Sequence, residues 1–311
     1  SRPGLRWFYT GGLENHPKVL ARMQMSGQLL GAGATQAAHA RSPFRLTRLQ
    51  ANAEWDLPET RRSPAGLPTD GTWLKKKRRS AGGSGVSLWR GGPPALGYYY
   101  QRRIDGISAS AVYIGHRDGA VCYGVTRQLI GAAWTGAQGF AYCGTSGPWP
   151  VSDRVRSQIE QIGDRVATAF KLDGLFGVDF VLADDTAWVV EINPRYTASV
   201  EILERVATIP AITMHLAACR GQRVTVPDTE TRCHGKAILY APRDVRIDAA
   251  LAERLLAEAG DWHSPEWADI PPAGTAIPAG RPVLTAFASA TTCEEVEEKI
   301  KGQLHLLRDR L

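Results

Sequence analysis

Hydrophobic and polar residues alternate with a period of two across residues 175–193, and this pattern predicts a β-hairpin. The face expected to be buried carries Val178, Phe180, Leu182, Trp188, Val190 and Ile192. The other face carries Asp179, Glu191 and Asn193. An odd number of residues in the loop around Asp184 and Asp185 would set Asp179 opposite Glu191, whereas an even number would put the two acids on opposite faces.

Apolar residues three and four positions apart predict a helix over residues 155–170 and another over 296–307 at the C-terminal end. Ser152 is the expected N-cap of the first helix, and Gly174 lies just past its end. Two further helical pieces are expected on either side of Pro210.

Short strands and turns are expected in most of the remaining chain. Residues 1–40 are typical of a strand, a glycine turn and a helix, residues 50–72 of a proline-rich connecting segment, and residues 73–116 of successive strands. Residues 221–311 look like a separate small unit of two strands and the closing helix. The three expected parts are residues 1–45, 46–220 and 221–311.

The composition is that of a globular protein. The 311 residues, 43% of them hydrophobic, are enough for two or three packed units. There is no run of 18 apolar residues and no signal-peptide pattern, so we expect no membrane span and a cytoplasmic location. Because the chain opens with Ser1 and a strand follows almost at once, we also expect that an N-terminal portion is missing or was removed.

The net charge of +6 suits anionic small substrates as well as a polynucleotide. The only dense basic run, Lys75 to Arg79, lies on a predicted strand, whose side chains point alternately to opposite faces. No aromatic stacking platform accompanies it, so we expect no nucleic-acid partner.

The five cysteines are odd in number, widely spread and without a C-x-x-C pair. They are therefore expected to be reduced, structural thiols. The seven histidines show no metal-ligand spacing.

The acids of the hairpin suggest a metal site. Two carboxylates facing each other across a ladder repel by a few tenths to about 1 kcal/mol, and a divalent cation reverses that sign. Asp179, Glu191 and Asn193 form an all-oxygen set of the kind that magnesium takes together with phosphate oxygens. The alternative is that the acids only solvate an exposed sheet face. Arg195, which follows a proline that ends the strand, favours the metal site because its guanidinium suits phosphate.

Residues 80–85 form a glycine-rich loop after a basic strand. Glycines let backbone N–H groups turn toward an anion, so the loop could hold phosphates, although it is not a Walker loop because no G-K-[ST] follows. The alternative is an ordinary flexible hairpin turn.

Taken in order, four segments resemble the ATP-grasp superfamily. They are "WLKKKRRSAGGSGV", "YYYQRRIDG", "FGVDF" and "EINPRYTAS", between residues 73 and 199. The branch that the chain most resembles is the carboligases related to biotin carboxylase, to which "YTGGLENHP" and the C-terminal "ADIPPAGTAIPAGRPVLTAFA" are also similar. The resemblance implies an α+β / α/β fold in which two subdomains clamp ATP. The first 45 residues would then be a partial Rossmann-like segment and the last part a small α/β unit.

The resemblance also implies roles for individual residues. Lys76 and Arg195 would be catalytic, with Arg195 steadying the transferred phosphate and Lys76 contacting the ATP phosphates. The implied nucleotide-binding set is Lys76, Ser80, Gly82, Gly83, Gly85, Gln101, Arg102, Ile104 and Asp105. The implied metal ligands are Asp179, Glu191 and Asn193, with Mg²⁺ as the ion and Mn²⁺ as an alternative.

Two departures from the family pattern affect these expectations. The hinge often carries an acid where this chain has Gln101, and the expected ribose-binding acid falls near Ser108, so that Asp105 would have to substitute. The N-terminal domain of the family corresponds here only to a remnant.

The leading hypothesis is an ATP-dependent ligase that joins a carboxylate to an amine through an acyl phosphate and releases ADP and phosphate. Arg127, Gln128 and the segment "YTASVE" would line the acceptor side. Relatives of this branch are associated with folate-like one-carbon carriers, which would suit a glutamate or pterin-linked carboxylate. The alternative is a non-catalytic or partner-dependent nucleotide-binding subunit. A homodimer is compatible with either.

Overall fold

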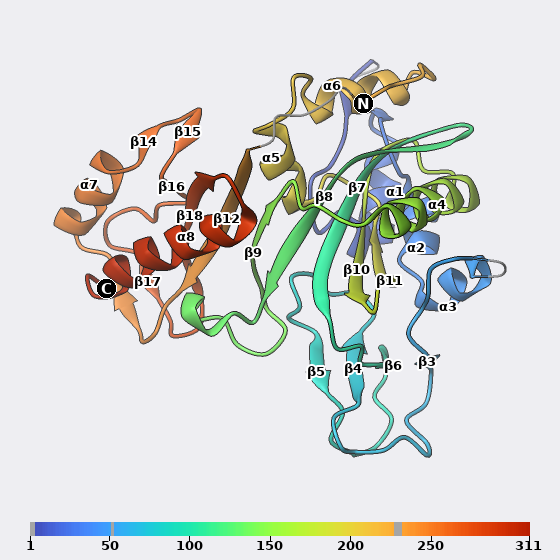
Figure 1. Ribbon diagram of the computed structural model, residues 1–311, viewed down its shortest axis with the longest axis horizontal. Helices are drawn as coiled ribbons and strands as arrows, with labels where there is room; N and C mark the ends of the chain where they lie inside the picture. Colours follow the sequence, from blue (N-terminus) through green and yellow to red (C-terminus); the bar gives the residue numbers. More distant parts are fainter. Residues whose placement is uncertain (1–3, 51–52, 227–231) are drawn as a thin grey trace.

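The computed structural model describes residues 4–50, 53–226 and 232–311. Within them, a large antiparallel sheet has the strand order β11-β10-β7-β8-β9-β12-β18-β16 (Figure 1). Its strands are β7 Ile107–His116, β8 Gly119–Ile130, β9 Tyr142–Gly147, β10 Gly174–Ala183, β11 Thr186–Asn193, β12 Cys233–Tyr240, β16 Trp267–Ala268 and β18 Pro282–Ala290.

Helices cover both faces of the middle of this sheet. On β7, Tyr113 packs in one apolar cluster with helix α4 (Asp153–Phe170), whereas Val112 and Ile114 pack in another with α5 (Ala198–Glu204) and α6 (Ala211–Ala218). This division follows from the period of two of a strand, since neighbouring residues point to opposite faces. The sheet is thus the central layer of the molecule.

Helix α4 confirms the expected helix. The Ser152 hydroxyl accepts a hydrogen bond from the Val155 amide, as an N-cap does. The left-handed residue at the C-terminal end is Lys171, with φ of 53°, whereas Gly174 begins β10. The two helical pieces around Pro210 are also confirmed, because Pro210 is the N-cap residue of α6.

A second, smaller antiparallel sheet has the order β3-β6-β4-β5 and projects from one end of the large sheet (Figure 1). Its strands are β3 Thr60–Arg61, β4 Trp73–Lys77, β5 Val86–Leu88 and β6 Tyr98–Arg102. Trp89 and Tyr100 pack edge to face in its small core, with ring centroids 4.9 Å apart. The expected connecting segment therefore contains an edge strand, β3.

The N-terminal residues form a small unit beside the large sheet. Strands β1 (Arg6–Trp7) and β2 (Gln28–Leu29) pair in parallel. The helices of this unit are α1 Pro17–Gln24, α2 Ala34–Ala40 and α3 Pro43–Leu46, with 3₁₀ turns at Leu13–Asn15 and Thr47–Leu49; a third 3₁₀ turn, Ala133–Thr135, follows β8.

The C-terminal residues continue the large sheet through β12 and β18. Helix α8 (Cys293–Arg308) packs on these strands, and the predicted stripe of Val296, Ile300, Leu304 and Leu307 is almost fully buried. The remaining elements are α7 Ala249–Ala257 and the two-residue strands β13 Val245–Arg246, β14 Gly260–Asp261, β15 Ser264–Pro265 and β17 Ala276–Ile277.

The expectation that all cysteines are reduced is wrong for one pair. Cys233 and Cys293 form a disulfide, with their Cα atoms 5.6 Å apart. Cys233 pairs with Ala290 in the β12–β18 ladder, and α8 starts three residues later, so the antiparallel pairing brings the two thiols together. Cys122, Cys143 and Cys219 are free. The sequence carries no spacing signal for this pair, because 60 residues separate its members.

No helix among the described residues is both long enough and apolar enough to span a bilayer.

Candidate active site

The two acids of the hairpin do face each other, although not for the reason that the loop parity suggested. Asp184 and Asp185 form a two-residue turn with φ of 49° and 57°, which is the even loop expected to separate the acids. A β-bulge corrects the register, because Phe180 pairs with Val189 but Asp179 pairs with Glu191. Val190 is thus the extra residue that brings Asp179 opposite Glu191.

The same bulge changes which residues of β11 are buried. Ala187 and Val189 are fully buried together with Ile192, whereas Trp188 and Val190 are only partly buried. The predicted core face is therefore right for β10 and for Ile192 and wrong for Trp188 and Val190. A single inserted residue reverses the facing of every residue on one side of it.

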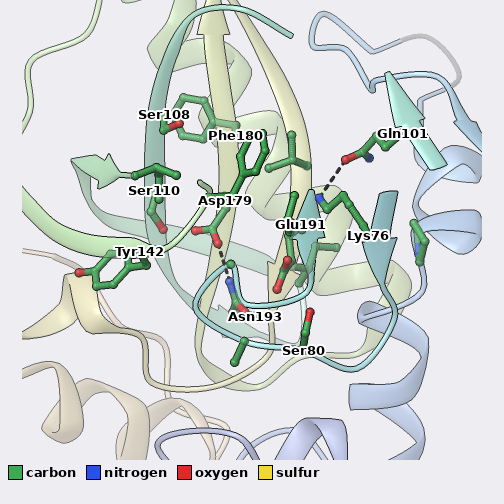
Figure 2. A pocket seen from close by; sticks show the side chains of 18 of the residues that line it. Lys76, Ser80, Gln101, Ser108, Ser110, Tyr142, Asp179, Phe180, Glu191 and Asn193 are labelled. Carbon is green, nitrogen blue, oxygen red and sulfur yellow. Dashed lines mark hydrogen bonds between the residues drawn. The ribbon is translucent and has the colours of Figure 1, made fainter. Parts of the chain in front are cut away.

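Asp179 is held by two amides. Gln128 on β8 donates from Nε2 to its Oδ1 at 3.0 Å. Asn193 donates from Nδ2 to its Oδ2 at 2.9 Å (Figure 2). Burial raises the pKa of the Asp179 carboxyl, partly offset by hydrogen bonds and by nearby arginines.

Glu191 is paired with Arg41, a residue that the sequence analysis did not single out. Arg41 is the C-cap of α2, and its Nη1 donates to the Glu191 carboxylate and to Asn193 Oδ1 at 3.3 Å. Its Nη2 donates to the Ser80 carbonyl at 2.9 Å. Burial lowers the pKa of Arg41. No motif signals this residue, since it comes from an unrelated helix 150 positions away.

Lys76 is a buried lysine of β4, with 7% of its surface exposed. Its Nζ donates to Gln101 Oε1 at 2.9 Å, and Figure 2 shows the two side chains pointing toward each other. The register explains the pairing, because Leu74 lies opposite Gln101 and Lys76 opposite Tyr99 on the adjacent β6. Gln101 thus accepts a charge-assisted hydrogen bond from Lys76.

The glycine-rich loop packs closely on the turn that precedes β9. Gly83 has φ of 77°, and a Cβ atom there would lie 1.7 Å from the carbonyl oxygen of Phe140. The amide of Tyr142 donates to the Gly82 carbonyl at 3.1 Å. Only glycine permits both this conformation and this approach.

A cavity of about 410 Å³ lies between the two sheets and the glycine-rich loop. Its volume falls within the range of roughly 300–1,000 Å³ usual for ligand pockets. It is lined by most of the predicted site residues: Lys76, Ser80, Gly82, Gly83, Gln101, Arg102, Ile104, Asp179, Glu191, Asn193 and Arg195. Arg41 lines it as well. The sequence therefore identified residues that the fold brings together on one cavity.

Two predicted contacts lie outside this lining. Gly85 sits behind the loop, against Lys77 and Ser80. Asp105 has 81% of its side chain exposed and pairs with Arg103 at 2.7 Å, while Ser108 lines the cavity. The backbone amide of Arg102, a residue expected to bind the nucleotide, donates to the Glu59 carbonyl at 2.8 Å.

Arg195 has an acidic partner of its own. Its Nε donates to Glu14 Oε1 at 2.7 Å, and the side chain of Glu14 is only 1% exposed. Tyr9 donates from its hydroxyl to the Pro194 carbonyl at 3.3 Å. Glu14 belongs to the turn "GLENHP", which therefore positions Arg195.

Only some of the residues expected on the acceptor side line the cavity. Gln128 and the residues from Thr197 to Ser199 line the cavity. Arg127 instead points to α8, with its Nη1 3.4 Å from Glu297. Tyr196 donates from its hydroxyl to Glu204 at 3.1 Å.

The chemistry of the predicted metal ligands fits a hard divalent cation. Asp179, Glu191 and Asn193 present carboxylate and amide oxygens, and one hydrogen bond links Asn193 to Asp179. Within the part of the chain that the structure describes, no three His, Cys, Asp or Glu residues converge as a metal site. The set holds only two acids, so it suits an ion that also takes phosphate oxygens.

The sequence model of the ATP-grasp domain family matches residues 44–199, about half of the chain. The chain belongs to the ATP-grasp family. Its solved structural neighbours include an ATP-grasp superfamily protein from Archaeoglobus fulgidus, at 21% identity and a TM-score of 0.53, where the match covers 72% of this chain and 66% of that one. This chain thus spans slightly less than two thirds of the length of that neighbour.

Two enzymes share more of the fold. N5-carboxyaminoimidazole ribonucleotide synthetase from Thermus thermophilus is 18% identical, with a TM-score of 0.65 over 94% of this chain and 79% of that chain. Biotin carboxylase from Campylobacter jejuni is 11% identical, with a TM-score of 0.67 over 95% of this chain and 73% of that chain. The expected ATP-grasp fold is confirmed, and the neighbours agree with the expected branch related to biotin carboxylase. At these identities the likeness to solved structures shows the fold alone.

Proposed function

We propose that this ATP-grasp protein is a ligase that uses ATP to join a carboxylate to an amine through an acyl phosphate. The observation that carries the proposal is the convergence of a buried lysine, an all-oxygen set and an arginine on one cavity beneath a glycine-rich loop. Lys76 lies on β4, whereas Glu191 lies on β11 and Arg195 just after it, and a role in packing alone would not gather these distant segments around open space.

In the proposed reaction, a carboxylate oxygen attacks the γ-phosphorus of ATP. The bond to the bridging oxygen breaks, and ADP leaves with that electron pair. The amine nitrogen then attacks the acyl carbon, the carbon–oxygen bond to phosphate breaks, and phosphate leaves while the nitrogen gives up its proton. The amide product, ADP and phosphate balance the reactants.

Each charged residue has a task in this sequence. Lys76 would neutralise phosphate charge beside Gln101, and the backbone of residues 80–85 would cover the phosphates. Arg195, held in position by Glu14, would stabilise the phosphate oxygens as charge develops on them. Asp179, Glu191 and Asn193 would hold Mg²⁺, or Mn²⁺ in its place, which when bound supplies positive charge to the phosphate oxygens.

The similar structures narrow the substrates to be tried. One of them, the biotin carboxylase domain of the 2-oxoglutarate carboxylase from Hydrogenobacter thermophilus, holds MgADP and bicarbonate. Bicarbonate therefore belongs in the screen beside glutamate and pterin-linked carboxylates, which the expected link to one-carbon carriers suggests. That link stays a prediction.

The test is a screen of carboxylate and amine pairs for ATP-dependent phosphate release, followed by a labelled reaction with the pair that works. With the carboxylate labelled with ¹⁸O, we expect one labelled oxygen in the released phosphate, because the carboxylate oxygen stays on phosphorus. Unlabelled phosphate would rule out the acyl phosphate. Binding of ATP without turnover by any pair would favour the nucleotide-binding alternative.

A further inference from the structure

The side chain of Arg41 crosses from the N-terminal segment to the hairpin and contacts five oxygen acceptors. Nη1 faces Glu191, Asn193 Oδ1 at 3.3 Å and the Ile192 carbonyl at 3.5 Å. Nη2 faces the Ser80 carbonyl at 2.9 Å and Asn15 Oδ1 at 3.4 Å. Only 10% of the side chain is exposed. Arg41 thereby links the predicted metal ligands to the start of the glycine-rich loop.

Arg41 and a divalent cation would need the same oxygens. Mg²⁺ binds its ligands at about 2.0–2.1 Å, so oxygens of Glu191 and Asn193 would have to converge on one point. The Nη1 atom of Arg41 already donates to both of them. Two positive charges about 4 Å apart repel strongly in a partly buried site. It is therefore unfavourable for the guanidinium of Arg41 and the metal ion to contact Glu191 and Asn193 at the same time.

The guanidinium of Arg41 also has an unused donor. Its Nε is buried and has no hydrogen-bond partner among the described residues. A buried donor without a partner carries a desolvation cost that an incoming acceptor removes. Because Arg41 lines the same cavity as Lys76 and Arg195, a phosphate group bound there would be such an acceptor.

We propose that Arg41 competes with the divalent cation for Glu191 and Asn193, and that it moves onto phosphate oxygens of the nucleotide when the cation binds. This inference rests on the proposed function. It assigns a phosphate-positioning role to the N-terminal segment. It also makes metal binding by the protein alone weak and metal binding with nucleotide strong. Movement of Arg41 would further release the Ser80 carbonyl, so the glycine-rich loop would adjust in the same step.

The test compares wild type with Arg41→Met and the matched control Arg45→Met, which removes an exposed arginine four residues away. Mn²⁺ binding without nucleotide is followed by the electron paramagnetic resonance signal of the free ion. For Arg41→Met we expect Mn²⁺ to bind about tenfold or more tightly than in wild type, because a charged competitor is gone. Affinity for MgATP, measured by calorimetry, should fall by about tenfold in the same variant. Arg45→Met should match wild type in both.

Tighter Mn²⁺ binding together with weaker MgATP binding would support the competition between Arg41 and the cation. A merely structural role of Arg41 would weaken both. Unchanged or weaker Mn²⁺ binding by Arg41→Met would overturn it. Arg41→Gln is a second neutral variant with the same expected shifts, and cooperative thermal unfolding shows which variants are folded. Failure of wild type to bind MgATP would contradict the proposed function, while the Mn²⁺ measurement would still decide the competition.

Discussion

The charged residues of the candidate site are held by partners within the protein. Asp179 receives two amide donors, Glu191 pairs with Arg41, and Arg195 pairs with Glu14. A buried ion without such a partner would cost several kcal/mol. These contacts fix each side chain near the cavity, so that only modest movement is needed to engage a ligand.

One buried carboxyl outside this cluster gives a pH prediction. Glu297 on α8 is 11% exposed, and burial raises its pKa above the ordinary 4.5 despite Arg127 and a hydrogen bond from Ser146. As pH rises from 4.5 through the raised pKa, the unfolded chain releases this proton before the folded protein does. The folded state binds more protons in that window, so stability falls with rising pH. Glu297→Gln lacks this loss, so its stability relative to wild type should rise as pH increases from 4.5 through the raised pKa of Glu297.

The measurement is urea unfolding of wild type and Glu297→Gln at several pH values. Glu298→Gln is the control, because Glu298 lies on the same helix with 70% of its side chain exposed. A stability difference between wild type and Glu297→Gln that does not change with pH would contradict this account.

At the scale of elements, the site depends on irregularities in regular structure. The bulge at Val190 sets the facing of Asp179 and Glu191, and the close packing of Gly83 on Phe140 sets the position of the loop. Neither the bulge nor this close packing can be predicted by counting residues along a strand. The period-two pattern predicts the hairpin and its polar face, but the register also depends on how β10 pairs with β7.

Gly83→Ala should disturb the loop far more than Gly82→Ala. Both glycines have positive φ, 77° and 61°, so alanine at either costs about 1–2 kcal/mol in conformation. At Gly83 the new Cβ would also collide with the Phe140 carbonyl, whereas at Gly82 nothing lies within 4 Å. We expect an additional ~1–3 kcal/mol of destabilisation or a displaced loop. Thermal unfolding measures the destabilisation, and the affinity for MgATP reports on a displaced loop. Equal effects of Gly83→Ala and Gly82→Ala would contradict the packing argument.

The residues that the sequence identified and those that it missed differ in how they reach the site. Lys76, Asp179, Glu191, Asn193 and Arg195 lie in segments whose local pattern indicates both element and chemistry. Arg41 and Glu14 reach the site through contacts with residues 150 and 181 positions away in the sequence. Both lie in the N-terminal part of the chain, which the sequence predicts to be only a remnant of a domain. Such contacts depend on the packing of the N-terminal unit against the hairpin, which no local pattern encodes.

At the scale of the whole molecule, the N-terminal and C-terminal parts of the chain both contribute to the structure around the cavity. The N-terminal unit supplies Arg41 to the cavity and Glu14 as the partner of Arg195, and β12 and β18 extend the large sheet (Figure 1). The disulfide between Cys233 and Cys293 closes the C-terminal extension on itself.

Reduction of this disulfide should lower the thermal unfolding temperature. A crosslink between residues 60 positions apart restricts the unfolded chain and typically contributes about 2–4 kcal/mol. The double variant Cys233→Ala/Cys293→Ala should unfold at the lower temperature and should not respond to reductant. Equal effects of reductant on wild type and on this variant would show that the pair does not stabilise the fold.

The central claim is that Asp179, Glu191 and Asn193 hold a divalent cation that binds the nucleotide in this cavity. The most direct measurement is calorimetric titration of ATP with magnesium and with a chelator, for wild type, Glu191→Gln and the exposed control Glu160→Gln. We expect wild type and Glu160→Gln to bind ATP at least about tenfold more tightly with magnesium, and Glu191→Gln to lose that gain. Absence of nucleotide binding by wild type, or an unchanged magnesium dependence in Glu191→Gln, would contradict the account.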